Sequence, residues 1–404
     1  MQRFYVWFER KIHLILTLAF LTACGCDQVG SVVDDVKSTV TETTPPSTAS
    51  APPVAPVIQT PPPQPPAPPT PEELLAEFRS LQPRQITDAA LARVTSQPEA
   101  ASAITELELH GEPVSRTGLG YLAAMENLTS LTLTSATLLP EDLSVLGQAT
   151  SLKVLGLSGT KTNDVVVGNL TTLSNLESLD LSFTAISPAA GAPMSRFTNL
   201  HVLNLASTPA DDSTIAAISS LPIKDLMLSR TRISNGSLAT IRNFKLLEAL
   251  QVPFCGVTGA GFQGYSGSGL KLLNVGETAF GLDGFINIKG IDSLENLNVY
   301  QAGLVEHTKI KTVFKSFPNL KILNAGNNAL TNAGMDVFFK GHKSLEELHL
   351  HGNKGISDQG LAALIAMKTL KVLDVHDTGC TANGATALKA KLPECKIITS
   401  GGTF

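Results

Sequence analysis

Apolar residues recur along most of the chain in a short motif, apolar-x-x-apolar-x-apolar, of which Leu128/Leu131/Leu133 is a clear copy. Alternation with a period of two predicts a short strand with one apolar face in each copy. Such a strand cannot bury that face alone, so regular repetition predicts strands stacked in parallel into a solenoid. Twelve copies are visible, 23 to 26 residues apart, beginning at positions 104, 128, 152, 176, 200, 223, 247, 270, 294, 320, 345 and 370.

A small hydrogen-bonding residue follows the last apolar position of most copies by three residues. It is Thr or Asn at Thr160, Thr184, Thr208, Thr231, Thr278, Asn328, Asn353 and Thr378. We expect these side chains to be buried and to satisfy backbone groups where the chain leaves the strand. Cys255 occupies the same slot and is expected to be a buried structural residue. After each turn, residues such as Thr331 or Ser357 are predicted to cap a short amphipathic helix.

The L-x-x-L-x-L pattern resembles the leucine-rich repeat, in its ribonuclease-inhibitor-like and GALA-like subtype. The resemblance implies an α/β solenoid, a curved horseshoe with a parallel concave sheet and short convex helices. It covers residues 104–404, as about twelve repeats with a C-terminal cap. We predict that residues 72–103 form an N-terminal helical cap with a degenerate half-repeat at 86–91, and that Thr70 and Pro71 start its first helix.

The N-terminus carries the features of a bacterial lipoprotein signal peptide. Arg3, Arg10 and Lys11 precede an apolar run over residues 12–23, which is too short for a membrane-spanning helix. The run ends in Leu-Thr-Ala-Cys24, which resembles a lipobox. The resemblance implies cleavage after residue 23 and lipidation of Cys24, with Gly25 favouring the outer membrane or cell surface. An ordinary secretory signal or an uncut anchor is the alternative.

Residues 24–71 are predicted to tether the solenoid to this lipid. Thirteen of the 24 prolines fall within residues 45–71. Such a segment favours extended polyproline II at about 3.1 Å per residue, or roughly 80 Å in all. Residues 27–44 are polar and expected to be disordered.

The composition of the chain argues against a nucleic-acid partner and against a disulfide-rich scaffold. The net charge is −5 and only 16% of residues are charged, without a long Lys/Arg run, which argues against nucleic acid as the partner. Five cysteines in 404 residues are too few for a disulfide scaffold, and Cys380 and Cys395 are expected to be buried free thiols.

The motifs in the sequence favour a protein that is not an enzyme. Residues 259–264 read Gly-Ala-Gly-Phe-Gln-Gly and match G-x-G-x-x-G, but they fall where a convex segment is predicted. We interpret their glycines as structural. The sequence contains no G-x-S-x-G, H-E-x-x-H or paired C-x-x-C motif, and no cofactor is expected.

Residues between the leucines are predicted to line the concave face. Most of them are neutral and polar, which suits a polypeptide or glycan partner. The candidate binding residues are Asp180, Asn204, Gln251, Asn274, Asn298, Tyr300, Asn324, His349, His351, Asp374 and His376.

The C-terminal four of these candidates form the sharpest local feature. His349 and His351 alternate on one predicted strand, about 7 Å apart, with Asp374 and His376 beside them on the next strand at about 4.8 Å. Imidazoles and a carboxylate are ligands for zinc or another divalent metal. The simpler interpretation is a solvated polar binding surface that uses histidine.

These observations predict a lipid-anchored, extracytoplasmic and monomeric binding protein of the bacterial cell envelope, with a protein or glycan ligand on its concave face. One alternative is a metal-binding protein or metal-dependent hydrolase built on His349, His351, Asp374 and His376. Another is an intracellular scaffold or substrate adaptor, as in eukaryotic proteins with related repeats.

Overall fold

The structure is a computed structural model that describes residues 68–110, 113–134 and 137–404. The signal segment, Cys24 and most of the tether lie outside the described residues. In the described part of the chain, no helix is both long and apolar enough to cross a membrane.

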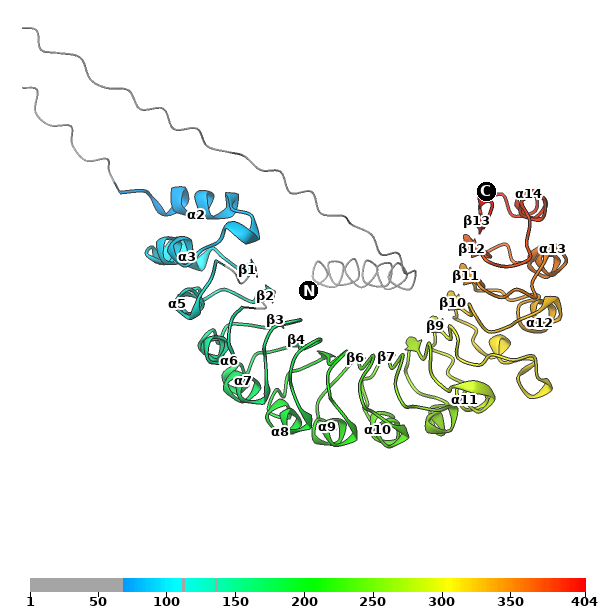
Figure 1. The fold of residues 1–404 in the computed structure, drawn as a ribbon, viewed down its shortest axis with the longest axis horizontal. Helices are drawn as coiled ribbons and strands as arrows, with labels where there is room; N and C mark the ends of the chain where they lie inside the picture. The colour runs from blue at the N-terminus through cyan, green and yellow to red at the C-terminus, as the bar shows by residue number, and fades with distance from the viewer. Residues whose placement is uncertain (1–67, 111–112, 135–136) are drawn as a thin grey trace, which may run out of the picture. The chain divides into compact units, whose positions relative to one another are not determined.

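Within the described residues, three short helices precede the first strand (Figure 1). They are α2 (Pro71–Ser80), α3 (Asp88–Thr95) and α4 (Pro98–Ser102), with a 3-10 turn η1 (Pro83–Gln85). The prediction for α2 is confirmed: Thr70 is its N-cap, and Thr70 and Glu73 exchange side-chain and backbone hydrogen bonds in a capping box. The half-repeat supplies α3 but no strand, because Ile86 lies buried in the coil between η1 and α3.

One sheet runs through the whole repeat domain, and its strands neighbour each other in sequence order. All strands pair in parallel except the last two, which form an antiparallel hairpin. The predicted solenoid is thus observed, and Figure 1 shows the strands on the inner side of an arc. The strands are β1 (Glu106–His110), β2 (Ser130–Thr134), β3 (Val154–Gly156), β4 (Ser178–Asp180), β5 (Val202–Asn204), β6 (Asp225–Met227), β7 (Ala249–Gln251), β8 (Leu272–Asn274), β9 (Asn296–Asn298), β10 (Ile322–Asn324), β11 (Glu347–His349), β12 (Val372–Asp374), β13 (Lys396–Thr399) and β14 (Gly402–Thr403).

Short helices cover the outer side of the arc (Figure 1). The α-helices are α5 (Arg116–Gly120), α6 (Pro140–Leu143), α7 (Asp164–Asn169), α8 (Gly191–Met194), α9 (Asp212–Ala217), α10 (Asn235–Ile241), α11 (Gly281–Asn287), α12 (Asn332–Phe338), α13 (Asp358–Leu361) and α14 (Ala382–Lys389). The 3-10 helices are η2 (Tyr121–Ala124), η3 (Ser144–Gln148), η4 (Leu170–Thr172), η5 (Pro188–Ala190), η6 (Gly259–Phe262), η7 (Thr308–Ile310), η8 (Phe314–Ser316) and η9 (Ala362–Leu364).

Adjacent convex segments are linked by hydrogen bonds at the helix starts. Asp164 on α7, for example, accepts from the backbone and hydroxyl of Ser187 in the next repeat, at 2.7 and 2.5 Å. Thr331 caps α12 as predicted. Ser357 stands at the N-cap of α13 but makes no cap bond, because its hydroxyl accepts from the Asn332 side chain instead. These hydrogen bonds therefore connect neighbouring repeats as well as capping the starts of helices.

The residues of the Thr/Asn slot are buried as predicted from the sequence, except Thr378, which is half-buried. Thr160, for instance, is buried and its hydroxyl donates to the carbonyl of Leu157 at 2.7 Å. Cys255 is buried too, and its thiol donates to the carbonyl of Leu228 at 2.9 Å. Cys380 and Cys395 are free thiols, of which Cys395 is buried and Cys380 half-buried. Gly259, the first glycine of the G-x-G-x-x-G match, lies on the convex 3-10 helix η6, and a Cβ there would meet the backbone of Phe280 and Gly284 at 2.0 and 2.1 Å.

Candidate functional site

The central concave column predicted from the sequence is present in the sheet. Residues in the middle of adjacent motifs are paired in register, as in Asp180 with Asn204 and His349 with Asp374. The column runs Glu108, Thr132, Gly156, Asp180, Asn204, Met227, Gln251, Asn274, Asn298, Asn324, His349 and Asp374. The repeats therefore hold these side chains at the strand spacing of about 4.8 Å.

Six of the candidate residues also have a local structural task. Each uses a side-chain oxygen to accept a hydrogen bond from the backbone N–H two residues later, at 2.8 to 3.1 Å. These bonds fix the turn that ends each strand. The six are Asp180, Asn204, Asn274, Asn298, Asn324 and Asp374. Asn274, Asn324 and Asp374 are in addition buried, so the amide-rich column offers less free surface than its composition indicates. Gln251 makes no such turn bond and is half-exposed between Met227 and Asn274.

The four C-terminal candidates meet at the buried carboxylate of Asp374. Nδ1 of His376 lies 2.7 Å from Oδ1 of Asp374. On the other side, Nδ1 of His351 and Nδ1 of His349 lie 3.6 and 3.8 Å from Oδ2. Glu347, which the sequence interpretation omitted, places its carboxylate 3.7 Å from Nε2 of His349.

Three rings are stacked beside this carboxylate. His351 and His376 lie on neighbouring repeats with ring centroids 4.9 Å apart and an interplanar angle of 2°. Tyr300, two repeats before His351, stacks on the His351 ring, with the two ring centroids 5.4 Å apart. Gly326 occupies the intervening position, and a Cβ there would lie 2.8 Å from the His351 ring, so glycine is what lets the two rings approach. We call Tyr300, His351 and His376 the ring stack.

Electrostatics gives three groups of this site, His349, His351 and Asp374, shifted pKa values. Burial disfavours charge on His349, but the carboxylates of Asp374 and Glu347 outweigh it and raise the pKa of His349 to about 9. Burial likewise opposes ionisation of Asp374, yet hydrogen bonds from His349 and His376 lower its pKa to about 2. Burial lowers the pKa of His351 despite the nearby Asp374. At neutral pH the site therefore holds an ionised His349–Asp374 pair beside a neutral His351.

A metal ion has three candidate ligands here rather than four. Ligand atoms of His351, Asp374 and His376 lie within 4.8 Å of one another, whereas His349 is outside this group. An ion held by two imidazoles lies close to the plane of each ring, about 2.0 Å from the nitrogen. The two ring planes are nearly parallel and separate, so they do not meet at a shared ion. Coordination by both histidines requires one ring to turn and give up its stack, which makes the metal alternative the weaker one.

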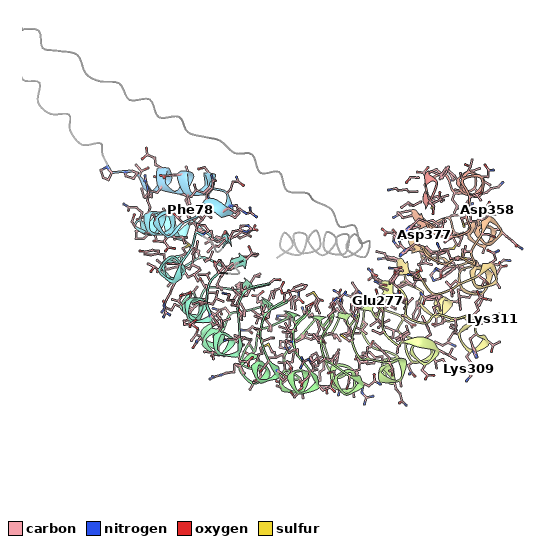
Figure 2. The ribbon with its side chains drawn as sticks, in the orientation of Figure 1. Phe78, Glu277, Lys309, Lys311, Asp358 and Asp377 are labelled. Atoms are coloured by element: carbon pink, nitrogen blue, oxygen red, sulfur yellow. The ribbon has the colours of Figure 1, made fainter. Side chains whose placement is uncertain are left out.

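A second group of residues, which the sequence interpretation missed, lies one position beyond the concave columns. Residues three after the central column have positive φ, with values from 48° to 57° at the eight non-glycine members. We call them the turn column: Gly159, Phe183, Ser207, Arg230, Phe254, Glu277, Gln301, Asn327, Gly352 and Asp377. Figure 2 shows two members, Glu277 and Asp377, on the inner side of the arc, while Lys309 and Lys311 lie outside. Their constant distance from each motif is the signal that finds them.

The opposite edge of the sheet, where the strands begin, is occupied by charge pairs. Lys271 pairs with Glu248 at 2.8 Å, Lys321 with Glu295 at 2.6 Å, and Lys371 with Glu346 at 2.5 Å. The same row holds Lys153 and Glu177, 3.0 Å apart. The two members of each exposed pair neutralise one another.

Comparisons with known proteins agree with the repeat architecture. A family model described as "Leucine Rich repeat" matches residues 341–364. A solved internalin (inlF) from Listeria monocytogenes is similar in structure, with a TM-score of 0.51 and 18% identity, over 81% of this chain and 93% of that chain. A leucine-rich repeat protein from Leptospira interrogans aligns with a TM-score of 0.48 and 16% identity, over 76% of this chain and 91% of its own. Among curated protein sequences, none matches this chain. The continuous parallel sheet and the structural similarity to the internalin show that the chain has the leucine-rich repeat fold, and the matching family model covers one repeat of it.

Proposed function

We propose that this chain is a non-catalytic binding protein that presents its concave face to a protein or glycan partner, in a monomer held at the bacterial cell envelope by a lipid on Cys24. The observation that carries the proposal is the unbroken concave sheet, on which side chains of twelve repeats are aligned in register. Such a surface is long, rigid and already formed, so the protein itself loses little conformational entropy when a ligand binds.

The binding role is tested by photo-crosslinking in intact cells. A photoreactive amino acid replaces Gln251, which is half-exposed on the concave face. The matched control replaces Val165, an exposed residue of the convex helix α7. We expect crosslinks to a defined partner from the concave position only. Equal crosslinking from both positions, or none from either, contradicts the proposal.

The anchor is tested by replacing its lipidation site. Two or three acyl chains give stable membrane attachment, whereas the unmodified chain has only a cleavable leader. We expect Cys24→Ser to move the protein from the membrane fraction to the soluble fraction. Persistence of the variant in the membrane fraction contradicts lipid anchoring. Retention of the wild-type chain in the cytoplasm would instead favour the intracellular scaffold alternative.

The metal alternative rests on the cluster of His351, Asp374 and His376. Metal analysis of the purified full-length chain separates it from the binding function proposed above. Stoichiometric metal that is lost when both histidines become alanine would establish a metal protein. We expect sub-stoichiometric metal that these substitutions leave unchanged, because the ring stack holds the imidazole planes parallel.

A further inference from the structure

The turn column contains two phenylalanines whose side chains are not part of the buried core. Phe183 and Phe254 have φ of 56° and 57°. Positive φ is disfavoured for a residue with a Cβ, whereas glycine adopts it freely. The fold accepts glycine at the same place, in Gly159 and Gly352. The side chains do not repay this cost by burial, since Phe183 is 66% exposed and Phe254 42% exposed.

The backbone of both residues is nevertheless fixed by hydrogen bonds, and the Phe254 ring has a further side-chain contact. The backbone N–H of Phe183 donates to the carbonyl of Ala206 at 2.9 Å, and that of Phe254 donates to the carbonyl of Gly276 at 3.3 Å. The guanidinium of Arg230 lies over the Phe254 ring, 3.9 Å from its centroid. Large apolar groups that are exposed, ordered and conformationally costly are the features of anchor residues at an interface.

The surroundings of the two rings indicate an elongated ligand. Phe183 and Phe254 are three repeats apart, or about 14 Å at the usual strand spacing. The concave residues beside them are small and do not rise between the rings: Ser182, Ala206, Ser229 and Pro253. In the C-terminal repeats the same column carries the bulky ring stack instead. A span of about 14 Å corresponds to roughly four residues of extended peptide.

Positively charged residues near the two rings indicate a negatively charged ligand. Arg230 of the turn column and Arg232, two residues after it, are both exposed. We call the turn column from Phe183 to Phe254 the rim. Among the described residues, no carboxylate oxygen lies within 4.0 Å of the charged nitrogens of either arginine. By contrast, the strand-start edge has its lysines paired with glutamates. The rim thus offers two apolar anchors and unneutralised positive charge between them.

We propose that Phe183, Arg230 and Phe254 form a docking site for an extended acidic peptide segment, in which large apolar side chains contact the two rings and a neighbouring carboxylate pairs with Arg230. This inference rests on the proposed binding function and names the partner chemistry for it. It places the contact in the fourth to seventh repeats, away from the His349–Asp374 cluster.

A random 12-residue peptide display library, panned against the purified full-length chain, tests the site. We expect enriched peptides to combine aromatic or large aliphatic residues with Asp or Glu. Phe183→Gly and Phe254→Gly should each weaken their binding about 10- to 30-fold, as for interface anchors. Arg230→Ala should weaken it and reduce its dependence on salt. Both glycine variants should keep the wild-type circular dichroism spectrum, since their positive φ suits glycine.

Two controls match these changes. Ser207→Gly lies in the same column at φ 57°, and Val165→Ser removes an exposed apolar side chain from the convex side. Neither should change peptide binding more than twofold. The proposal is overturned if no peptide is enriched, if the peptides lack acidic residues, or if the double Phe variant binds them as wild type does. It is also overturned if glycans on an array, and no peptide, bind this rim.

The crosslinking experiment separates this inference from the binding function itself. If a partner crosslinks to position 251 equally in the wild-type chain and in the Phe183→Gly/Phe254→Gly variant, the binding function stands and the docking site fails. If no partner crosslinks to the concave face at all, the binding function fails as well.

Discussion

Asn353 is predicted to be costly to remove from the repeat core, as is Asn328, because each of these side chains bonds four backbone groups. It is fully buried, and its Oδ1 accepts from the backbone N–H groups of Asn328 and Leu330 at 2.9 and 3.0 Å. Its Nδ2 donates to the carbonyls of Ala325 and Leu350 at 3.0 and 2.7 Å. One side chain therefore serves four backbone groups in two repeats.

Asn353→Ala leaves these groups without their side-chain partner in a site closed to water. Each buried polar group left unsatisfied costs about 1–3 kcal/mol, and the Leu350 carbonyl keeps a long contact with the backbone of residue 353 at 3.4 Å. We therefore expect a loss of roughly 3–6 kcal/mol in the free energy of unfolding. Thr184→Ala is the matched comparison, because Thr184 occupies the same slot but makes one bond, to the carbonyl of Leu181 at 2.5 Å. It should cost about 1 kcal/mol.

Urea denaturation followed by circular dichroism measures both values, and hydrogen exchange locates the loss in the repeats around residue 353. Local loss is expected because each repeat contacts only its neighbours. Asn353→Thr should fall between the two alanine variants, since a threonine hydroxyl replaces one of the two donor bonds. Equal destabilisation by Asn353→Ala and Thr184→Ala would refute the reasoning that the number of served backbone groups sets the cost.

Two further predictions concern the C-terminal site. The raised pKa of His349 adds stability to the fold that is fully present below pH 6.5 and is lost as the pH rises through about 9. The lowered pKa of Asp374 adds stability that is present above about pH 4 and is lost as the pH falls through about 2. Unfolding free energy should thus decline by up to about 3 kcal/mol in each window. Asp374→Asn should remove the acid window and weaken the alkaline one, where Glu347 still raises the pKa of His349; a wild-type profile in that variant would contradict the pairing. Gly326→Ala should push the His351 ring away from Tyr300, which NMR detects as loss of the ring-current shift between them; an unchanged shift would contradict the stacked arrangement.

Sequence reasoning located the strands because burial of leucine leaves no choice of register. The alternating pattern at each motif places one face of the strand inward, and a one-residue slip would expose every leucine. The thirteenth parallel strand, β13, was absorbed into the predicted C-terminal cap because its motif begins with Glu394 instead of an apolar residue. Its apolar Ile397 is the strand residue that pairs with Leu373.

The functional surface was harder to predict because local hydrogen bonding competes with ligand binding. From sequence, Asn204 and Asn298 are free amides on a concave face, but in the fold their oxygens close the turns that follow. The stacking of Tyr300 on His351 depends on Gly326 in the repeat between them, and it became visible only in three dimensions. Phe183 and Phe254 lie outside the concave columns, at backbone angles that sequence pattern alone does not reveal.

The charge pairs along the strand-start edge constrain how this solenoid changes in length. From Glu248 to Lys371 the sign alternates from one repeat to the next. Loss of a single repeat there, such as the one that carries Glu295, would set Lys271 beside Lys321. Like charges directly opposite each other on neighbouring strands are destabilising, whereas loss of two consecutive repeats restores the alternation. The edge therefore gives the array a parity: duplication or deletion in even numbers of repeats preserves its electrostatics, and odd numbers do not.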